Sequence, residues 1–313
     1  MRIGLKLHLI ILVWLLSACG GGSSDNFSVA LSSSPPADSA NDEALSDSVV
    51  EQENTITVDY KVVNPSYGTV VNYEKREPDQ RISYGDNALQ FGDLWLPSNG
   101  LNNVPLLIFV HGGCWSSDFR LDYANAFASS VADNFGVAVW SLEYRSTGDV
   151  GGGWPGSYED IVLALSKLSG LKLYGIDTSR VALAGHSAGG HLALLAASQP
   201  EAAQLSAVIG LAAIVDFASY AQGEGSCERA AVAFMGEPYI DSPEAYQLAN
   251  PIGRTILPDV VLLHGGKDNI VPIENPRSSG FDLIEIDEAG HFDWVHPETK
   301  GFARLLDTLQ SVL

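Results

Sequence analysis

The stretch Arg180-Val-Ala-Leu-Ala-Gly185-His-Ser187-Ala-Gly189-Gly190-His191-Leu-Ala-Leu decides the fold. Its apolar run Val181–Ala184 is typical of a buried parallel strand, and a helical pattern begins at Ala188. The five residues Gly185–Gly189, where the two patterns meet, fit Gly-x-Ser-x-Gly, the nucleophile elbow, in which a serine lies on a sharp turn from strand to helix. Glycines two positions before and after the serine relieve the crowding there. We therefore expect Ser187 to be exposed at a helix N-terminus, where free N–H groups face a developing anion.

The rest of the chain alternates strand-like and helix-like segments, which predicts an α/β fold with a doubly wound, mostly parallel sheet. Apolar or alternating runs predict strands at residues 56–63, 80–84, 89–96, 105–110, 137–144, 181–184, 207–215, 260–264 and 283–286. Helical periodicity predicts helices at residues 121–135, 160–171, 188–198 and 297–313. The segment 216–250 is irregular and rich in Gly and Ala, and we expect it to form a small lid.

The N-terminus is typical of an export signal. Two basic residues precede a short apolar core, Leu7–Leu16, which is too short to span a bilayer. The ending Leu16-Ser-Ala-Cys19 resembles the lipobox of bacterial lipoproteins, which implies cleavage before Cys19 and lipidation of its thiol. An ordinary signal peptide with an incidental cysteine is the alternative. By the same resemblance, Gly20 points to the outer membrane, so we expect an exported protein that is anchored by lipid to the cell envelope.

Composition divides the chain into three segments. Residues 1–18 are the expected signal peptide, residues 19–54 the lipidated cysteine with a disordered tether, and residues 55–313 the folded domain. The tether is rich in Ser, Asp, Ala, Pro and Gly and poor in aromatic residues, so it cannot build a core. With 38 acidic against 17 basic residues, the net charge of the chain is −21. Such a surface repels polyanions, which excludes nucleic acid as a partner.

Two loops after predicted strands supply partners for the serine. A serine hydroxyl is a weak nucleophile that needs a base within hydrogen-bond reach. In this version of the site the chain order is serine, acid, histidine, and Asp268 and His291 each follow an apolar strand at the carboxyl edge where Ser187 lies. We expect His291 to take the proton of Ser187 while Asp268 orients the imidazole. His296 is the alternative base and Asp293 the alternative acid.

Backbone N–H groups that could hold an oxyanion occur at two places. Ala188 follows the serine directly, and the run Gly112-Gly113-Cys114 follows the predicted strand 105–110, where the second donor of such sites lies. Glycines let the backbone turn its N–H groups toward a ligand. We expect the oxyanion hole to comprise the N–H of Ala188 and the N–H groups of Gly112, Gly113 and Cys114. An ordinary Gly-Gly turn is the alternative for this loop.

Two neighbours of these motifs, Trp115 and His186, are expected to line the substrate pocket. Core packing is the alternative for Trp115. Further along, Glu143-Tyr-Arg145 precedes the predicted helix that carries Asp160. An ion pair between Arg145 and Asp160 would pin the intervening loop, which is a structural rather than a catalytic role.

The two remaining cysteines, Cys114 and Cys227, are expected to form a disulfide. Their loops should leave the same edge of the sheet, so their Cα atoms could approach within about 7 Å, the limit for bridging. If Cys19 is lipidated in an exported protein, these two thiols pair with none left over. Two buried free thiols are the alternative.

Together these segments resemble the α/β-hydrolase superfamily over about residues 56–313. Four motifs resemble the bacterial branch near arylformamidases and the feruloyl and acetyl-xylan-type esterases: His111-Gly-Gly-Cys-Trp115, Glu143-Tyr-Arg145, Gly152-Gly-Trp-Pro155 and Gly185-His-Ser-Ala-Gly-Gly-His191. The hormone-sensitive-lipase branch usually carries a third glycine where this chain has Cys114.

The resemblance implies a serine hydrolase that cleaves carboxylic esters, in small molecules or linked to polymers, through an acyl-enzyme and without a metal or other cofactor. An arylformamidase-like amidase or an exopeptidase is the first alternative. A surface binding protein built on an inactive hydrolase fold is the second. The acyl and alcohol groups are set by the shape of the segment 216–250, in which no motif is recognisable.

Overall fold

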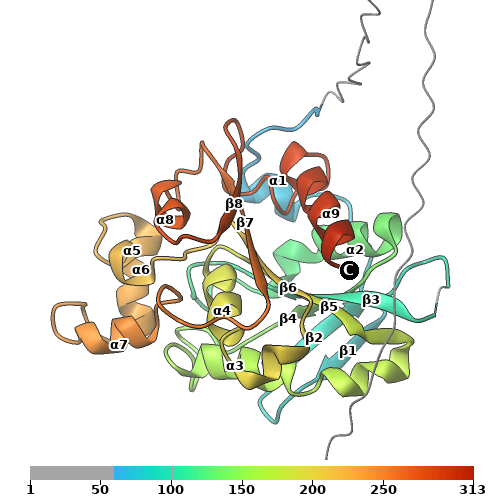
Figure 1. Ribbon diagram of the computed structural model, residues 1–313, viewed down its shortest axis with the longest axis horizontal. Coiled ribbons are helices and arrows are strands. Elements are labelled where there is room, and N and C mark those ends of the chain that lie inside the picture. Colours follow the sequence, from blue (N-terminus) through green and yellow to red (C-terminus); the bar gives the residue numbers. More distant parts are fainter. Residues whose placement is uncertain (1–59, 101) are drawn as a thin grey trace, which may run out of the picture. The chain divides into compact units, whose positions relative to one another are not determined.

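One sheet of eight strands organises the part of the chain that the computed structural model describes, residues 60–100 and 102–313 (Figure 1). The strands lie in the order β1-β2-β4-β3-β5-β6-β7-β8. β1 and β2 pair antiparallel with each other, β2 pairs antiparallel with β4, and every other neighbouring pair is parallel. This confirms the predicted doubly wound, mostly parallel sheet. The strand bounds are Gln80–Ser83 (β1), Phe91–Trp95 (β2), Val104–Val110 (β3), Ala138–Leu142 (β4), Ile176–His186 (β5), Ala207–Leu211 (β6), Asp259–Gly265 (β7) and Asp282–Ile286 (β8).

Helices cover both faces of this sheet. Helices α3 and α4 pack on one face, and α2 and α9 pack on the other (Figure 1). Within the described residues, no helix combines the length and the apolar character needed to cross a bilayer. The helices are Tyr67–Val71 (α1), Asn125–Phe135 (α2), Gly156–Leu165 (α3), Ala188–Ala196 (α4), Phe217–Tyr220 (α5), Ser226–Met235 (α6), Pro243–Leu248 (α7), Glu274–Arg277 (α8) and Lys300–Val312 (α9), with 3-10 helices at Leu121–Ala124, Leu168–Tyr174 and Pro200–Gln204.

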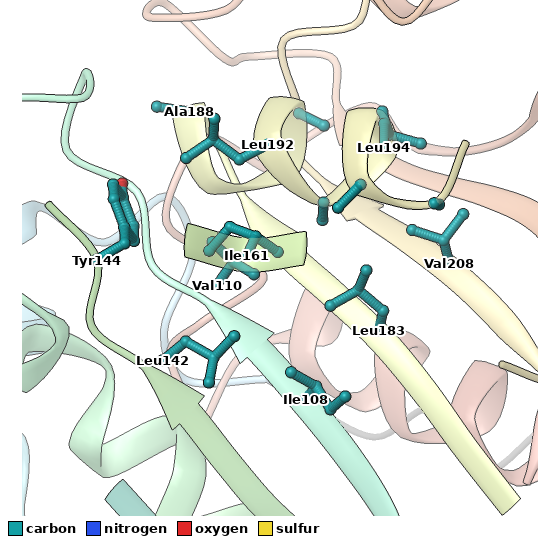
Figure 2. Close-up of a cluster of buried hydrophobic side chains, with 14 of the residues drawn as sticks. Ile108, Val110, Leu142, Tyr144, Ile161, Leu183, Ala188, Leu192, Leu194 and Val208 are labelled. Atoms are coloured by element: carbon teal, nitrogen blue, oxygen red, sulfur yellow. The ribbon is translucent and has the colours of Figure 1, made fainter. Parts of the chain in front are cut away.

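Strand β3 shows why the central strands are apolar throughout. Successive side chains of a strand point to opposite faces, so Ile108 and Val110 enter the core beneath α3 and α4, while Leu107 and Phe109 enter the core beneath α2 and α9. Figure 2 shows Ile108, Val110 and Leu192 of α4 as members of one cluster of buried hydrophobic side chains. Burying each such side chain contributes about 1.5–3 kcal/mol, so both faces of β3 hold the sheet between its two helix layers.

The expected signal peptide, Cys19 and the tether lie outside the described residues. The strand predicted at residues 56–63 is wrong over the four of its residues that the structure describes, which form neither helix nor strand. The chain turns directly afterwards at Asn64, whose φ is 50°. The N–H of Asn64 donates to Asp293 Oδ1 over 3.3 Å, so a loop rather than a sheet edge holds this segment. Helix α1 follows, unforeseen from the sequence and capped by Ser66.

The segment 216–250 is helical rather than irregular, because it contains α5, α6 and α7. Each longer helix has a recognisable boundary. The N–H of Gly225, ahead of α6, donates to the Glu228 carboxylate, and Gly236 ends α6 with a φ of 85°. Pro243 occupies the first turn of α7, where its missing N–H costs nothing. Small residues obscure the apolar period of these helices in the sequence.

Several other predicted boundaries shift, and the strand predicted at residues 181–184 extends over Ile176–His186. The helix predicted at residues 160–171 begins at Gly156 and ends at Leu165, and the chain continues as a 3-10 helix. The strand predicted at residues 207–215 ends at Leu211, because Ala212 adopts a φ of 45° that no strand accommodates.

Candidate active site

Ser187 lies on the turn between β5 and α4 with φ 56° and ψ −121°, a strained conformation for a residue with a side chain. Glycines lie two positions before and after it because the backbone there approaches too closely for any larger residue. A Cβ on Gly185 would lie 2.3 Å from the carbonyl oxygen of Gly189, and a Cβ on Gly189 would lie 2.2 Å from that of Val110. The nucleophile-elbow geometry predicted from the sequence is therefore present.

The serine is less open than the motif predicts, because only 2 % of Ser187 is exposed. The loop after β3 lies directly against it. A Cβ on Gly112 would come within 3.0 Å of Ser187 Cβ and within 2.8 Å of the carbonyl oxygen of His186. Only a glycine at position 112 allows this loop to approach the serine so closely.

Asp268 and His291 meet at the same edge of the sheet, from the loops after β7 and β8. His291 Nδ1 lies 2.7 Å from Asp268 Oδ2, and Asp268 also accepts the N–H groups of Ile270 and Val271 at 2.9 Å each. Burial opposes ionisation of Asp268, but the charge and hydrogen bond of His291 outweigh it, so the pKa of Asp268 lies below its usual value. The carboxylate thus stays ionised and fixes the orientation of the imidazole.

Ser187 Oγ and His291 Nε2 form no hydrogen bond with each other among the described residues. Such bonds are often long in unliganded sites and tighten when substrate binds. The alternative partners are engaged elsewhere. The His296 ring lies 4.9 Å from that of Tyr73, and Asp293 accepts the N–H of Gly290 at 2.8 Å. Asp293 therefore braces the turn that carries His291.

A second histidine, His264 at the end of β7, adjoins the same carboxylate. His264 Nε2 lies 3.4 Å from Asp268 Oδ2 and 2.8 Å from the carbonyl oxygen of Val271. Burial lowers the pKa of His264, so the neutral ring donates from Nε2 and helps to close the loop around Asp268. Sequence reasoning gave His264 no role, because only its position at a strand end was visible.

The loop after β3 has three consecutive residues with positive φ: Gly113 at 111°, Cys114 at 51° and Trp115 at 58°. Of the expected oxyanion donors, Gly112 is not free, since its N–H donates to Tyr123 Oη over 2.9 Å. The N–H groups of Gly113, Cys114 and Ala188 form no hydrogen bond within the described part of the chain. These three groups are thus the candidate donors for an anion beside Ser187.

His111 fixes the peptide unit that carries the N–H of Gly113. Its Nδ1 lies 2.7 Å from the carbonyl oxygen of Gly112, and its Nε2 lies 3.1 Å from Glu143 Oε1. Because a trans peptide is planar, holding the Gly112 oxygen on one side directs the Gly113 N–H to the other. Burial opposes ionisation of Glu143, but His111 and the N–H groups of Tyr144 and Leu121 outweigh it and lower the pKa of Glu143.

The two residues expected to line the pocket lie in the interior instead. Trp115 is fully buried, donates from Nε1 to His191 Nδ1 over 3.2 Å and stacks on Phe234 at 5.1 Å. Its core-packing alternative is therefore correct. His186 is 1 % exposed and hydrogen-bonded through both ring nitrogens, so it also faces away from solvent.

Aromatic rings lie beside His291, which sequence reasoning missed. Phe292 packs edge-on against His291 with ring centroids 5.1 Å apart. Tyr67 of α1 lies 5.9 Å from Phe292 and 5.5 Å from Phe119. These residues come from three distant segments, so nothing in the local sequence signals their meeting.

Two covalent or ionic links expected from the sequence are present. Cys114 and Cys227 form a disulfide with Cα atoms 5.2 Å apart, which joins the loop after β3 to helix α6. Arg145 Nη2 lies 2.6 Å from Asp160 Oδ1, and Gln90 Nε2 donates to the same oxygen over 2.6 Å. The buried carboxylate of Asp160 therefore pins the loop after β4 to α3.

Comparison with known proteins identifies the fold and the family of this chain. The chain is similar in structure to Esterase B from Lactobacillus rhamnosis (HN001), with a TM-score of 0.62 and 20% identity over 76% of this chain and 87% of that one. The chain therefore has the α/β-hydrolase fold. Residues 92–279, more than half of the chain, match the BD-FAE family. This protein belongs to the BD-FAE family.

The curated relatives are matched over a smaller share of their own length. Esterase LipC of Mycobacterium tuberculosis is 30% identical over 244 residues, which cover 68% of this chain and 59% of the relative. The isoprenylcysteine alpha-carbonyl methylesterase ICME of Arabidopsis thaliana is 26% identical over 231 residues, which cover 63% of this chain and 50% of the relative. The chain thus matches between half and three fifths of the length of these proteins.

Proposed function

We propose that this protein is a serine hydrolase that cleaves carboxylic esters through an acyl-enzyme. The observation that carries the proposal is the 2.7 Å contact between His291 Nδ1 and Asp268 Oδ2 at the sheet edge where Ser187 occupies its strained turn. An ionised carboxylate on Nδ1 leaves Nε2 of the imidazole as the basic nitrogen. The names of the two curated relatives described above, an esterase and a methylesterase, support ester substrates.

The reaction would proceed in two halves. Ser187 Oγ attacks the ester carbonyl while His291 Nε2 takes the hydroxyl proton, and Asp268 stabilises the imidazolium that forms. The oxyanion accepts hydrogen bonds from the N–H of Ala188 and from those of the Gly113–Cys114 loop. His291 then returns the proton to the leaving alcohol, and a water molecule repeats the sequence on the acyl-serine.

Turnover of matched substrates tests the proposal. We expect the mature protein to hydrolyse an aryl acetate faster than N-formyl aniline or an aminoacyl anilide. Ser187→Ala should lower kcat by at least about 10⁴-fold, while Ser129→Ala, which alters another buried serine on the opposite helix layer, should leave kcat unchanged. An aryl acetate rate within tenfold of the wild type for a folded Ser187→Ala protein would refute the assignment.

The same assays separate the alternatives. Preferential anilide or formanilide cleavage that still requires Ser187 would make the protein an amidase or exopeptidase. A wild-type protein that is inert to all three substrates and is not labelled by a fluorophosphonate would be a binding protein on a hydrolase fold. We expect labelling of the wild type at Ser187 and none of Ser187→Ala.

We further propose that the protein is exported and anchored by lipid on Cys19, with the outer membrane as its site. The support is the lipobox-like run Leu16-Ser-Ala-Cys19 with Gly20 after it. Metabolic labelling with palmitate and membrane fractionation should both be positive for the wild type and both be lost in Cys19→Ser. An exported wild type that is fully soluble and unlabelled would refute the anchor.

A further inference from the structure

Tyr123 and His186 connect two loops of the proposed active site through the protein interior. Tyr123 Oη lies 2.9 Å from the N of Gly112 and 2.8 Å from His186 Nδ1. His186 Nε2 lies 2.9 Å from the carbonyl oxygen of His291. The side chains are 2 % and 1 % exposed, so solvent does not compete for these bonds. The result is a continuous chain of hydrogen bonds from the oxyanion loop to the main chain of His291.

The groups at the two ends of this hydrogen-bond chain fix the direction in which each proton is donated. The N–H of Gly112 can only donate, and the carbonyl of His291 can only accept. The Tyr123 oxygen therefore accepts from Gly112, and its hydroxyl proton goes to His186 Nδ1. His186 must carry its one proton on Nε2 and donate it to His291. Every donor and acceptor is then matched by one tautomer of a neutral ring.

The surroundings keep that ring neutral. Burial, with a smaller contribution from His291, lowers the pKa of His186 to about 3. A cationic ring would place a proton on Nδ1 against the Tyr123 hydroxyl and break the directional pattern. The ring is thus neutral at neutral pH, and its partners, the Tyr123 hydroxyl and the His291 carbonyl, select the tautomer with the proton on Nε2.

Resting on the function proposed above, we propose that Tyr123 and His186 are positioning residues that hold the oxyanion loop and the His291 loop in register. Both main-chain polar groups of Gly112 are held, since its N–H donates to Tyr123 and its carbonyl oxygen contacts His111 Nδ1. The His291 main chain is held by His186, the elbow residue directly before Ser187. The donors for the oxyanion and the proton acceptor are therefore placed relative to each other as well as to Ser187.

Kinetics of Tyr123→Phe and His186→Asn test this role. Phenylalanine removes both hydrogen bonds of the hydroxyl, and asparagine can still accept from Tyr123 but cannot reach the His291 carbonyl. We expect kcat for an aryl acetate to fall about 10- to 100-fold in each variant, because small displacements of catalytic groups cost this much. KM should stay within about threefold of the wild type, since neither side chain faces the substrate.

A double variant distinguishes a connected chain from two separate stabilising contacts. Once one link is broken the register is lost, so Tyr123→Phe/His186→Asn should be no slower than about the slower single variant. Tyr246→Phe is the matched control. It removes an equally buried hydroxyl that donates to the Glu237 carbonyl over 2.7 Å, and it should keep the wild-type kcat.

Unchanged kcat in both single variants, or losses that multiply in the double variant, would overturn the proposal. If Tyr123→Phe does not fold, His186→Asn alone tests the positioning role, because its kcat must still fall while its KM stays close to the wild-type value. The proposed function fails separately. A wild type inert to the aryl acetate and to the fluorophosphonate refutes the esterase, whereas an active wild type with fully active variants refutes only the positioning role.

Discussion

Breaking the disulfide between Cys114 and Cys227 should destabilise this protein more than any single surface change. The bond spans a sequence separation of 113 residues and encloses α2, β4, α3, β5, α4, β6 and α5. Restricting an unfolded loop of that length is worth about 4.8 kcal/mol at 25 °C in the chain-entropy treatment, an upper figure. Cys227 is 4 % exposed on α6, so the loss of its packing adds to the effect.

Urea unfolding measures this directly. We expect the free energy of unfolding to fall by about 2–5 kcal/mol both on reduction of the wild type and in the Cys114→Ala/Cys227→Ala variant. Ser226→Ala, an exposed neighbour of Cys227, is the control and should change it by less than about 0.5 kcal/mol. A loss below about 1 kcal/mol with an unaltered denaturant slope would refute the reasoning. So would two alkylated cysteines in the non-reduced exported protein.

Three further perturbations follow from the site and its supports. Asp268→Asn should lower kcat by about 10⁴-fold in an aryl acetate assay, because the amide favours the wrong imidazole tautomer; a loss under tenfold would contradict this. Burial lowers the pKa values of His186 and His191 to about 3. Between about pH 6.5 and 3, only the unfolded chain binds these two protons. Urea titrations should therefore show the free energy of unfolding decreasing as pH is lowered, by up to about 2.7 kcal/mol per pH unit; a flat profile would refute it. Arg145→Met should lower the free energy of unfolding by roughly 3 kcal/mol, because it leaves the Asp160 carboxylate buried without its cation. A thermal melt that matches the wild type would contradict this.

The central part of the fold was predictable because its signals are local. The strand around Val110 is apolar on both faces, since helices cover both faces of the sheet, and the glycines around Ser187 mark a backbone approach that no other residue permits. Asp268 and His291 could be chosen because loops after parallel strands meet at one edge. Their 2.7 Å contact agrees with that choice.

What the sequence could not reveal depends on partners distant along the chain. Tyr123 carries no motif, and its role in the structure comes from Gly112 and His186, which lie on other elements. Trp115 follows the glycine loop and is expected at the pocket, but three positive φ values turn its ring into the core. The oxyanion assignment of Gly112 failed because Tyr123, 11 residues further along and without a motif of its own, accepts its N–H.

Helix α4 is buried along all nine of its residues, from Ala188 to Ala196. An amide in such a helix meets solvent only when the whole domain opens, so hydrogen exchange along α4 should report the global free energy of unfolding. The segment with α7 exposes Ile240 and Leu248, at 84% and 62%, and its amides should exchange through smaller openings. We therefore expect Ser187 to be attached to one of the last of the described elements to open, so that the surrounding segments can fluctuate while Ser187 stays in place.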